Sequence, residues 1–95
     1  MLDSNDILRS SCRRKILKAL FKKRELGIMN LVNITNSTYN EVDRNLNILE
    51  ERSLIVQLHL GRRRIIRLKL DNEKTMQLLK ILKVLNGSID LNQLQ

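Results

Sequence analysis

Proline and tryptophan are missing from this 95-residue sequence, which contains a single cysteine, a single histidine and three glycines. Cys12 alone forms no internal disulfide, so a secreted domain stabilised by disulfides is excluded. Cys12 and His59 are too few ligands for a zinc site within one chain, and we expect neither a metal nor a cofactor. Gly27, Gly61 and Gly87 lie too far apart in the sequence for a phosphate-cradling loop.

Long apolar runs are missing as well. No stretch approaches the roughly 18–20 residues that a membrane span needs, and the first residues do not form a basic region followed by an apolar one. We therefore expect no transmembrane segment, no signal peptide and a cytoplasmic location. Two aromatic residues, Phe21 and Tyr39, are too few to stack single-stranded nucleic acid. No nucleophile–base pair and no carboxylate dyad emerges, which argues against an enzyme.

Positive charge dominates what is present. The sequence has 18 Lys and Arg against 10 Asp and Glu, a net charge of +8. Residues 1–24 carry eight basic and two acidic side chains, and residues 54–70 carry five basic and none acidic. Residues 25–53 between these blocks carry two basic and five acidic side chains, a net charge of −3. This pattern favours a polyanionic partner, either nucleic acid or an anionic membrane surface.

Neither proline nor a low-complexity linker divides the chain, so we expect one domain, residues 4–86, followed by a tail, residues 87–95. The periodicity predicts a mainly α fold with a β-hairpin. Its expected elements are helices 4–24, 28–34 and 38–52, strands 54–60 and 63–70 joined by a tight turn at Gly61-Arg62, and a final helix 71–86. Ser4 or Asn5 is expected to cap the first helix.

The helix predicted over 38–52 has an apolar and a polar face. Ser37 or Thr38 is expected to cap it, with Glu41 at capping-box spacing from Thr38. The residues predicted to face the core are Tyr39, Val42, Leu46 and Leu49. Those predicted to point outward are Asn40, Arg44, Asn47 and Glu51. The first helix has a comparable apolar stripe, formed by Leu8, Cys12, Ile16 and Leu20.

The final helix, 71–86, is apolar on more than one side. Such a helix is either central in its fold or paired with another chain, and the last helix of a small domain is rarely central. We therefore expect a homodimer whose interface is made by Met76, Leu79, Leu82 and Leu85.

The element order and residues 28–55 resemble the winged helix-turn-helix of ArsR-like and MarR-like prokaryotic transcription regulators. The segments that carry the resemblance are Leu31-Val32, Asn36-Ser37-Thr38, the run from Val42 to Leu49, Ser53-Leu54-Ile55, and Gly61-Arg62-Arg63-Arg64 at the wing tip. The resemblance spans roughly residues 12–85. Ten Asn and ten Ile, with no Pro, indicate an A·T-rich genome of an archaeal, viral or low-G·C bacterial kind.

The resemblance implies a dimeric, sequence-specific transcription regulator that binds double-stranded DNA and is therefore associated with the nucleoid. The third helix would enter the major groove, where Asn40 and Asn47 could pair with adenine and Arg44 with guanine or a phosphate. The wing would lie along the DNA backbone or in a minor groove, and the helix N-terminus would hold a phosphate. The implied DNA-binding residues are Ser37, Thr38, Asn40, Arg44, Asn47, Arg62, Arg63, Arg64, Arg14 and Lys18.

Two residues depart from the pattern of these families. Asp43 stands where a small polar residue is common, and its carboxylate would repel phosphate. Ser53 replaces the usual glycine. The ligand cluster of the metal-sensing ArsR members is missing too, which argues against metal sensing.

Less specific interpretations account for the same residues. The polar helix face and the arginine hairpin can simply be solvated surfaces, and Cys12 is either a small core residue or a redox sensor. One alternative function is an architectural nucleoid protein with little base preference; another is a winged-helix protein-interaction module that never touches DNA. Binding of the basic first helix to a membrane surface is a weaker alternative, and we expect no membrane partner.

Overall fold

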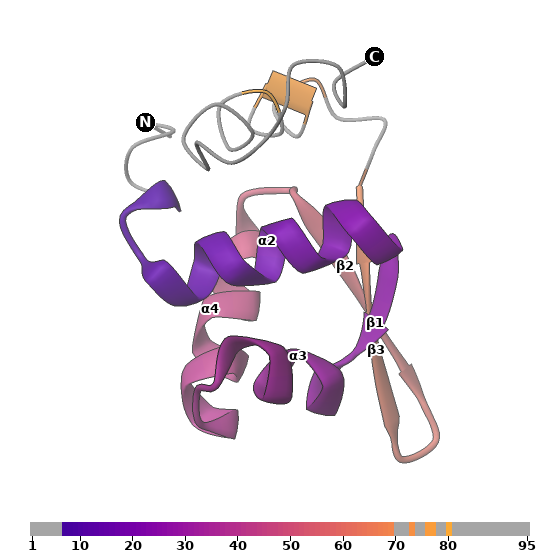
Figure 1. The fold of residues 1–95 in the computed structure, drawn as a ribbon. Helices are drawn as coiled ribbons and strands as arrows, with labels where there is room; N and C mark the ends of the chain where they lie inside the picture. Colours follow the sequence, from indigo (N-terminus) through magenta and orange to yellow (C-terminus); the bar gives the residue numbers. More distant parts are fainter. Residues whose placement is uncertain (1–6, 70–72, 74–75, 78–79, 81–95) are drawn as a thin grey trace.

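The computed structural model describes residues 7–69, 73, 76–77 and 80. The elements in this part of the chain (Figure 1) are α2 (Ser11–Lys23), β1 (Glu25–Gly27), α3 (Ile28–Thr35), α4 (Tyr39–Glu51), β2 (Ile55–Leu60) and β3 (Arg63–Leu68). No helix among the described residues is long and apolar enough to cross a membrane. The second and third predicted helices and both predicted strands are confirmed, with ends that move by no more than two residues.

The first helix is shorter than predicted because a serine divides it. Ser10 caps α2: its hydroxyl accepts a hydrogen bond from the Arg13 N–H at 3.2 Å, and Ile7 and Leu8 form a separate helical turn before it. A serine side chain that binds nearby backbone favours a helix start over a helix interior. The prediction of one helix over 4–24 is therefore wrong, and the caps predicted at residues 4 and 5 lie outside the described part of the chain.

The turn between α3 and α4 follows from asparagine and threonine. Asn36 ends α3 in the left-handed conformation, with a φ of 55°, which asparagine tolerates better than most residues. Thr38 then caps α4, and its side-chain oxygen accepts a hydrogen bond from the Glu41 N–H at 3.1 Å. The predicted cap at Thr38 is confirmed.

The three strands form one antiparallel sheet in the order β1-β3-β2, so β3 is central. The sequence does not predict β1, because three residues are too few to show the alternation of a strand. Its Glu25 faces Arg67 of β3, and the guanidinium donates to the carboxylate at 2.6 Å. Gly61 turns the chain between β2 and β3 with a φ of 65°, a conformation in which glycine is unstrained.

Aliphatic side chains from α2, α3, α4, β2 and β3 meet in one core. Its buried members are Ile7, Leu8, Cys12, Ile16, Leu17, Ala19, Leu20, Ile28, Leu31, Val42, Leu46, Leu49, Leu54, Ile55, Ile66 and Leu68. The predicted stripe of the first helix is therefore buried, Cys12 included. The inward face of α4 is confirmed except at Tyr39, which is 45% exposed because its hydroxyl lies at the surface and accepts a hydrogen bond from Arg64.

The C-terminal predictions fall mostly outside the described residues. Glu73, Met76, Gln77 and Lys80 are helical and exposed, and Met76 is 42% exposed. The rest of the predicted helix 71–86, including Leu79, Leu82 and Leu85, and the predicted tail 87–95 lie outside the described part. The dimer interface stays a prediction.

A polar link joins α4 to α2 beneath the surface. Asn45 of α4 is 5% exposed; its Nδ2 donates to the Glu41 carbonyl at 2.8 Å, and its Oδ1 accepts from Arg13 Nη1 at 2.9 Å. Arg13 Nε also donates to the Ile7 carbonyl at 3.0 Å, so one guanidinium ties the N-terminal turn to α4. Asn45 lies three residues after Val42 and four before Leu49, the spacing of the core-facing residues, and this spacing is the sequence signal that marks it.

Replacing Asn45 with alanine is expected to lower the free energy of unfolding by about 1–3 kcal/mol, because Arg13 loses a buried acceptor. Urea unfolding followed by circular dichroism measures the loss. Asn40→Ala, on the exposed face of the same helix, is the matched control and should change stability by less than about 0.5 kcal/mol. Equal effects of the two substitutions would contradict the link.

The end of α4 explains why the resembled families usually have glycine where this chain has Ser53. Ser53 adopts a φ of 64°, and its N–H donates to the Glu50 carbonyl at 2.9 Å. The Leu54 N–H donates to the Leu49 carbonyl at 3.0 Å, and both leucines are buried. These two bonds form a Schellman motif, in which the residue at position 53 must be left-handed. A residue with a Cβ is strained there, whereas glycine is not.

Ser53→Gly is accordingly expected to stabilise the fold by about 0.5–1 kcal/mol, because it relieves this strain. Thermal unfolding should show a Tm higher by ~2–8 °C. Ser11→Gly, at the first helical residue of α2, is the control and should lower the Tm, since glycine costs stability in a helix. A Ser53→Gly variant with a lower Tm would argue against a strained Ser53.

Candidate nucleic-acid interface

The outward face of α4 carries the side chains that the sequence assigns to base contacts. Asn40 and Arg44 are exposed and one helical turn apart, and neither has a partner among the described residues. Asn47 and Glu51 are exposed as well, so the predicted outward face is confirmed. Asn47 differs from the other two, because its Oδ1 accepts a hydrogen bond from Gln57 Nε2 at 3.1 Å.

The N-terminus of α4 lies next to this face. Thr38 is exposed, and its hydroxyl oxygen is engaged as the helix cap. Ser37 is half-buried, and its hydroxyl donates to the Thr35 carbonyl at 3.4 Å. Both predicted phosphate ligands therefore lie where the helix N-terminus opens, a place that favours an anion.

The three arginines of the hairpin do not share one direction. Figure 1 shows the β2–β3 hairpin extending beyond the helices, and Gly61 and Arg62 form its tip. Arg63 and Arg64 are consecutive residues of β3, so their side chains lie on opposite faces of the strand. Arg62 and Arg63 are exposed, whereas the Arg64 side chain is only 15% exposed.

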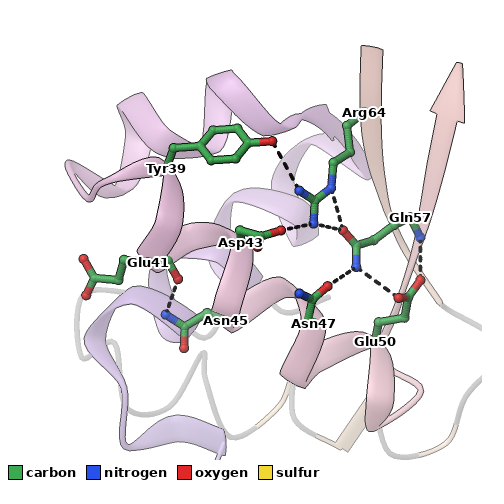
Figure 2. Close-up of polar contacts among 8 residues, drawn as sticks. All are labelled: Tyr39, Glu41, Asp43, Asn45, Asn47, Glu50, Gln57 and Arg64. Carbon is green, nitrogen blue, oxygen red and sulfur yellow. Dashed lines mark hydrogen bonds and ion pairs between the residues drawn. The ribbon is translucent and has the colours of Figure 1, made fainter. Parts of the chain in front are cut away.

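Arg64 points back to α4 and is held there by three side chains (Figure 2). Its Nη2 lies 2.6 Å from Asp43 Oδ1, and its Nη1 donates to the Tyr39 hydroxyl at 3.4 Å. Its Nε and Nη2 both donate to Gln57 Oε1, at 2.9 and 2.5 Å. The guanidinium thus connects α4 with β2 and β3.

Gln57 extends this network along the edge of the hairpin (Figure 2). Its Nε2 donates to Asn47 Oδ1 and to Glu50 Oε1, at 3.1 and 3.0 Å, and its backbone N–H donates to Glu50 Oε2 at 3.2 Å. The register explains why Gln57 and Arg64 meet: Gln57 faces Ile66 and His59 faces Arg64, so all four residues lie on the same side of the sheet. Sequence reasoning misses Gln57 and Glu50, since nothing local in the sequence distinguishes them from solvated residues.

The two basic residues predicted on the first helix lie apart from the wing. In Figure 1, α2 crosses above α3, away from the hairpin tip. Lys18 is exposed on this helix. Arg14 is half-buried, and its Nη1 donates to the backbone carbonyls of Leu8 and Arg9, the latter at 3.2 Å. The structure thus engages the Arg14 guanidinium within the chain.

Within the described ranges, no three His, Cys, Asp or Glu side chains gather where they could hold a metal ion.

Comparison with known proteins finds similarity in structure. No protein-family model and no curated protein matches the sequence. The AntR antimony-specific transcriptional repressor superposes with a TM-score of 0.76 and 18% identity, over 97% of this chain and 78% of that one. A transcriptional regulator homologue from Pyrococcus horikoshii OT3 has a TM-score of 0.71 and 19% identity, over 90% of this chain and 89% of that one.

A third similar structure is the homodimeric winged helix-turn-helix DNA-binding domain Mb0332 from Mycobacterium bovis. Its TM-score is 0.69 and its identity 20%, over 88% of this chain and 75% of that one. At such identities the likeness establishes the fold. The predicted architecture is therefore confirmed: α3 and α4 form a helix-turn-helix, β2 and β3 form the wing, and the chain has the winged helix-turn-helix fold that these transcription regulators share.

Proposed function

We propose that this chain is a transcription regulator that binds double-stranded DNA as a homodimer, with α4 in the major groove. One observation carries the proposal: on a winged helix-turn-helix fold, α4 presents the uncommitted side chains of Asn40 and Arg44 beside a wing that carries exposed Arg62 and Arg63. A recognition helix supplies base contacts from its first turns, and arginines supply phosphate contacts.

Asn40 and Arg44 are the residues best suited to read bases. Asparagine can pair with both N6 and N7 of adenine, and arginine with O6 and N7 of guanine. Asn47 is less suited, because the bidentate contact with adenine needs its amide oxygen and Gln57 already donates to that oxygen. We therefore expect Asn47 to contribute at most its amide nitrogen.

Phosphate contacts would surround this base-reading face. The N-terminus of α4, with Ser37 and Thr38, is suited to hold one phosphate, and Arg62 and Arg63 can follow the backbone or enter a minor groove. Lys18 could bind a flanking phosphate. Arg14 could do so only after its guanidinium releases the carbonyls of Leu8 and Arg9.

The dimer is supported by two independent features. The sequence of the final predicted helix is apolar on more than one side, and the similar domain Mb0332 is homodimeric. Two copies would place two reading helices on one duplex, as dimeric helix-turn-helix proteins do on half-sites about one helical turn apart.

Selection of bound fragments from random duplex DNA tests the proposed function. We expect an enriched motif, bound at least ~10³-fold more tightly than random DNA, and a plot of log K against log salt with a slope of about −6 to −10. Enrichment of no motif with a steep salt slope would indicate an architectural protein. A slope near zero would refute DNA binding and favour a protein-interaction module.

Two variants should distinguish base contacts from phosphate contacts in the same measurement. Arg44→Ala should relax the motif at one position, at a cost of about 1–3 kcal/mol in discrimination. Arg62→Gln should weaken binding to all sequences alike and flatten the salt slope by about 0.9 for each copy in the complex.

The homodimer is checked by sedimentation equilibrium. The wild type is expected at about twice the chain mass of 11.2 kDa, and Leu82→Asp should shift it to the monomer mass because a carboxylate would enter an apolar contact. Gln77→Asp adds the same group at an exposed position and is the control. A wild-type chain that sediments as a monomer at micromolar concentration would contradict the dimer.

A further inference from the structure

The network between α4 and the wing accounts for Asp43, which stands where the resembled families commonly have a small polar residue. This carboxylate lies on the recognition helix one residue before Arg44, where a phosphate backbone would be repelled. Its Oδ1 lies 2.6 Å from Arg64 Nη2, and its side chain is 39% exposed against 15% for Arg64. The negative partner of the pair therefore lies closer to solvent than the positive one.

The donor geometry of Arg64 leaves it little to offer a phosphate. A guanidinium has five N–H donors. Its Nε–H is bound to Gln57, both Nη2 hydrogens are directed at Gln57 and Asp43, and one Nη1 hydrogen at Tyr39. By this assignment four of the five are used within the chain. Arg63, one residue earlier, is exposed and has no partner among the described residues.

We propose that Arg64 has an indirect role in DNA binding. Its guanidinium neutralises the Asp43 carboxylate on the recognition helix and holds α4 against the wing. It does not itself bind phosphate. This inference rests on the proposed function, because it concerns the way α4 is presented to DNA. Arg64 is thus a positioning residue, and Arg62 and Arg63 are the phosphate-contacting arginines of the wing.

Charge balance at the interface provides the test. Asp43 and Arg64 together contribute no net charge, so removing both should leave the electrostatic attraction to DNA unchanged. Removing either one alone changes the local charge by one unit per copy. The salt dependence of duplex binding measures such a change, because each phosphate neutralised contributes about 0.9 to the slope.

The experiment is a double-mutant cycle on duplex DNA, using the full chain at several salt concentrations. Arg64→Gln is expected to weaken binding at 0.15 M salt, by about 5-fold if one copy of the chain contacts the duplex and by about 30-fold if two copies do. Asp43→Asn is expected to strengthen binding by up to the same factor. The double variant D43N/R64Q should bind within about threefold of the wild type with an unchanged salt slope.

Arg63→Gln is the matched control, since it removes the same charge from the neighbouring residue. We expect it to weaken binding by about 5–30-fold with a flatter slope. A double variant D43N/R64Q that binds as weakly as Arg63→Gln, with an equally flat slope, would overturn the inference and make Arg64 a phosphate contact.

Thermal unfolding without DNA provides a readout that does not depend on the proposed function. Asp43→Asn and Arg64→Gln should each lower the Tm by ~1–6 °C, and the double variant by less than the sum, because both remove the same ion pair. Additive Tm changes would show that Asp43 and Arg64 are not coupled, and would overturn this inference even if the chain binds duplex DNA. A wild-type chain that fails to bind any duplex would instead refute the proposed function, and with it the role of the pair in DNA binding.

Discussion

The burial of aliphatic side chains in one shared core is the constraint on which the other features depend. With one phenylalanine and no tryptophan, the chain fills its core with leucine, isoleucine and valine, each of which stabilises the fold by roughly 1.5–3 kcal/mol when buried. Because Val42, Leu46 and Leu49 must point inward, the helical period directs Asn40 and Arg44 outward. The packing of the core thereby determines which side chains α4 presents.

Two guanidinium groups complete this arrangement from opposite sides of α4. Asp43 and Asn45 are two residues apart, about 200° around the helix, and each binds an arginine from another element. Arg13 connects the helix with the N-terminal turn, and Arg64 connects it with the wing. The hydrophobic core fixes the orientation of α4. These directional contacts further restrict its rotation about its axis and its position along that axis.

Local patterns in the sequence predict much of this fold. Periodicity indicates α4 and β3, composition indicates the apolar α3 and the β-rich β2, and the cap at Thr38 and the turn at Gly61 follow from their chemistry. The start of α2 was missed because Ser10 acts only locally, and β1 because Glu25–Gly27 is defined by its partner strand. Such features depend on what lies nearby in three dimensions.

The candidate site is predictable at its exposed residues and not in its internal contacts. The outward position of Asn40 and Arg44 follows from helix geometry. The separation of Arg64 from Arg62 and Arg63 needs the strand register, and its partner Gln57 is recognisable only once β2 and β3 are paired. Asp43 cannot be interpreted from its local sequence, because its counter-charge, Arg64, lies 21 positions later in the sequence.

The Glu50–Gln57 contact also bears on solubility. β2 is an edge strand, and an edge strand with free N–H groups can pair with the edge of another molecule and begin an aggregate. The Glu50 carboxylate accepts the outward-facing Gln57 N–H at 3.2 Å and so occupies a donor that an incoming strand would need. The same acidic side chain that contacts the wing therefore also leaves one donor fewer for strand addition at this edge.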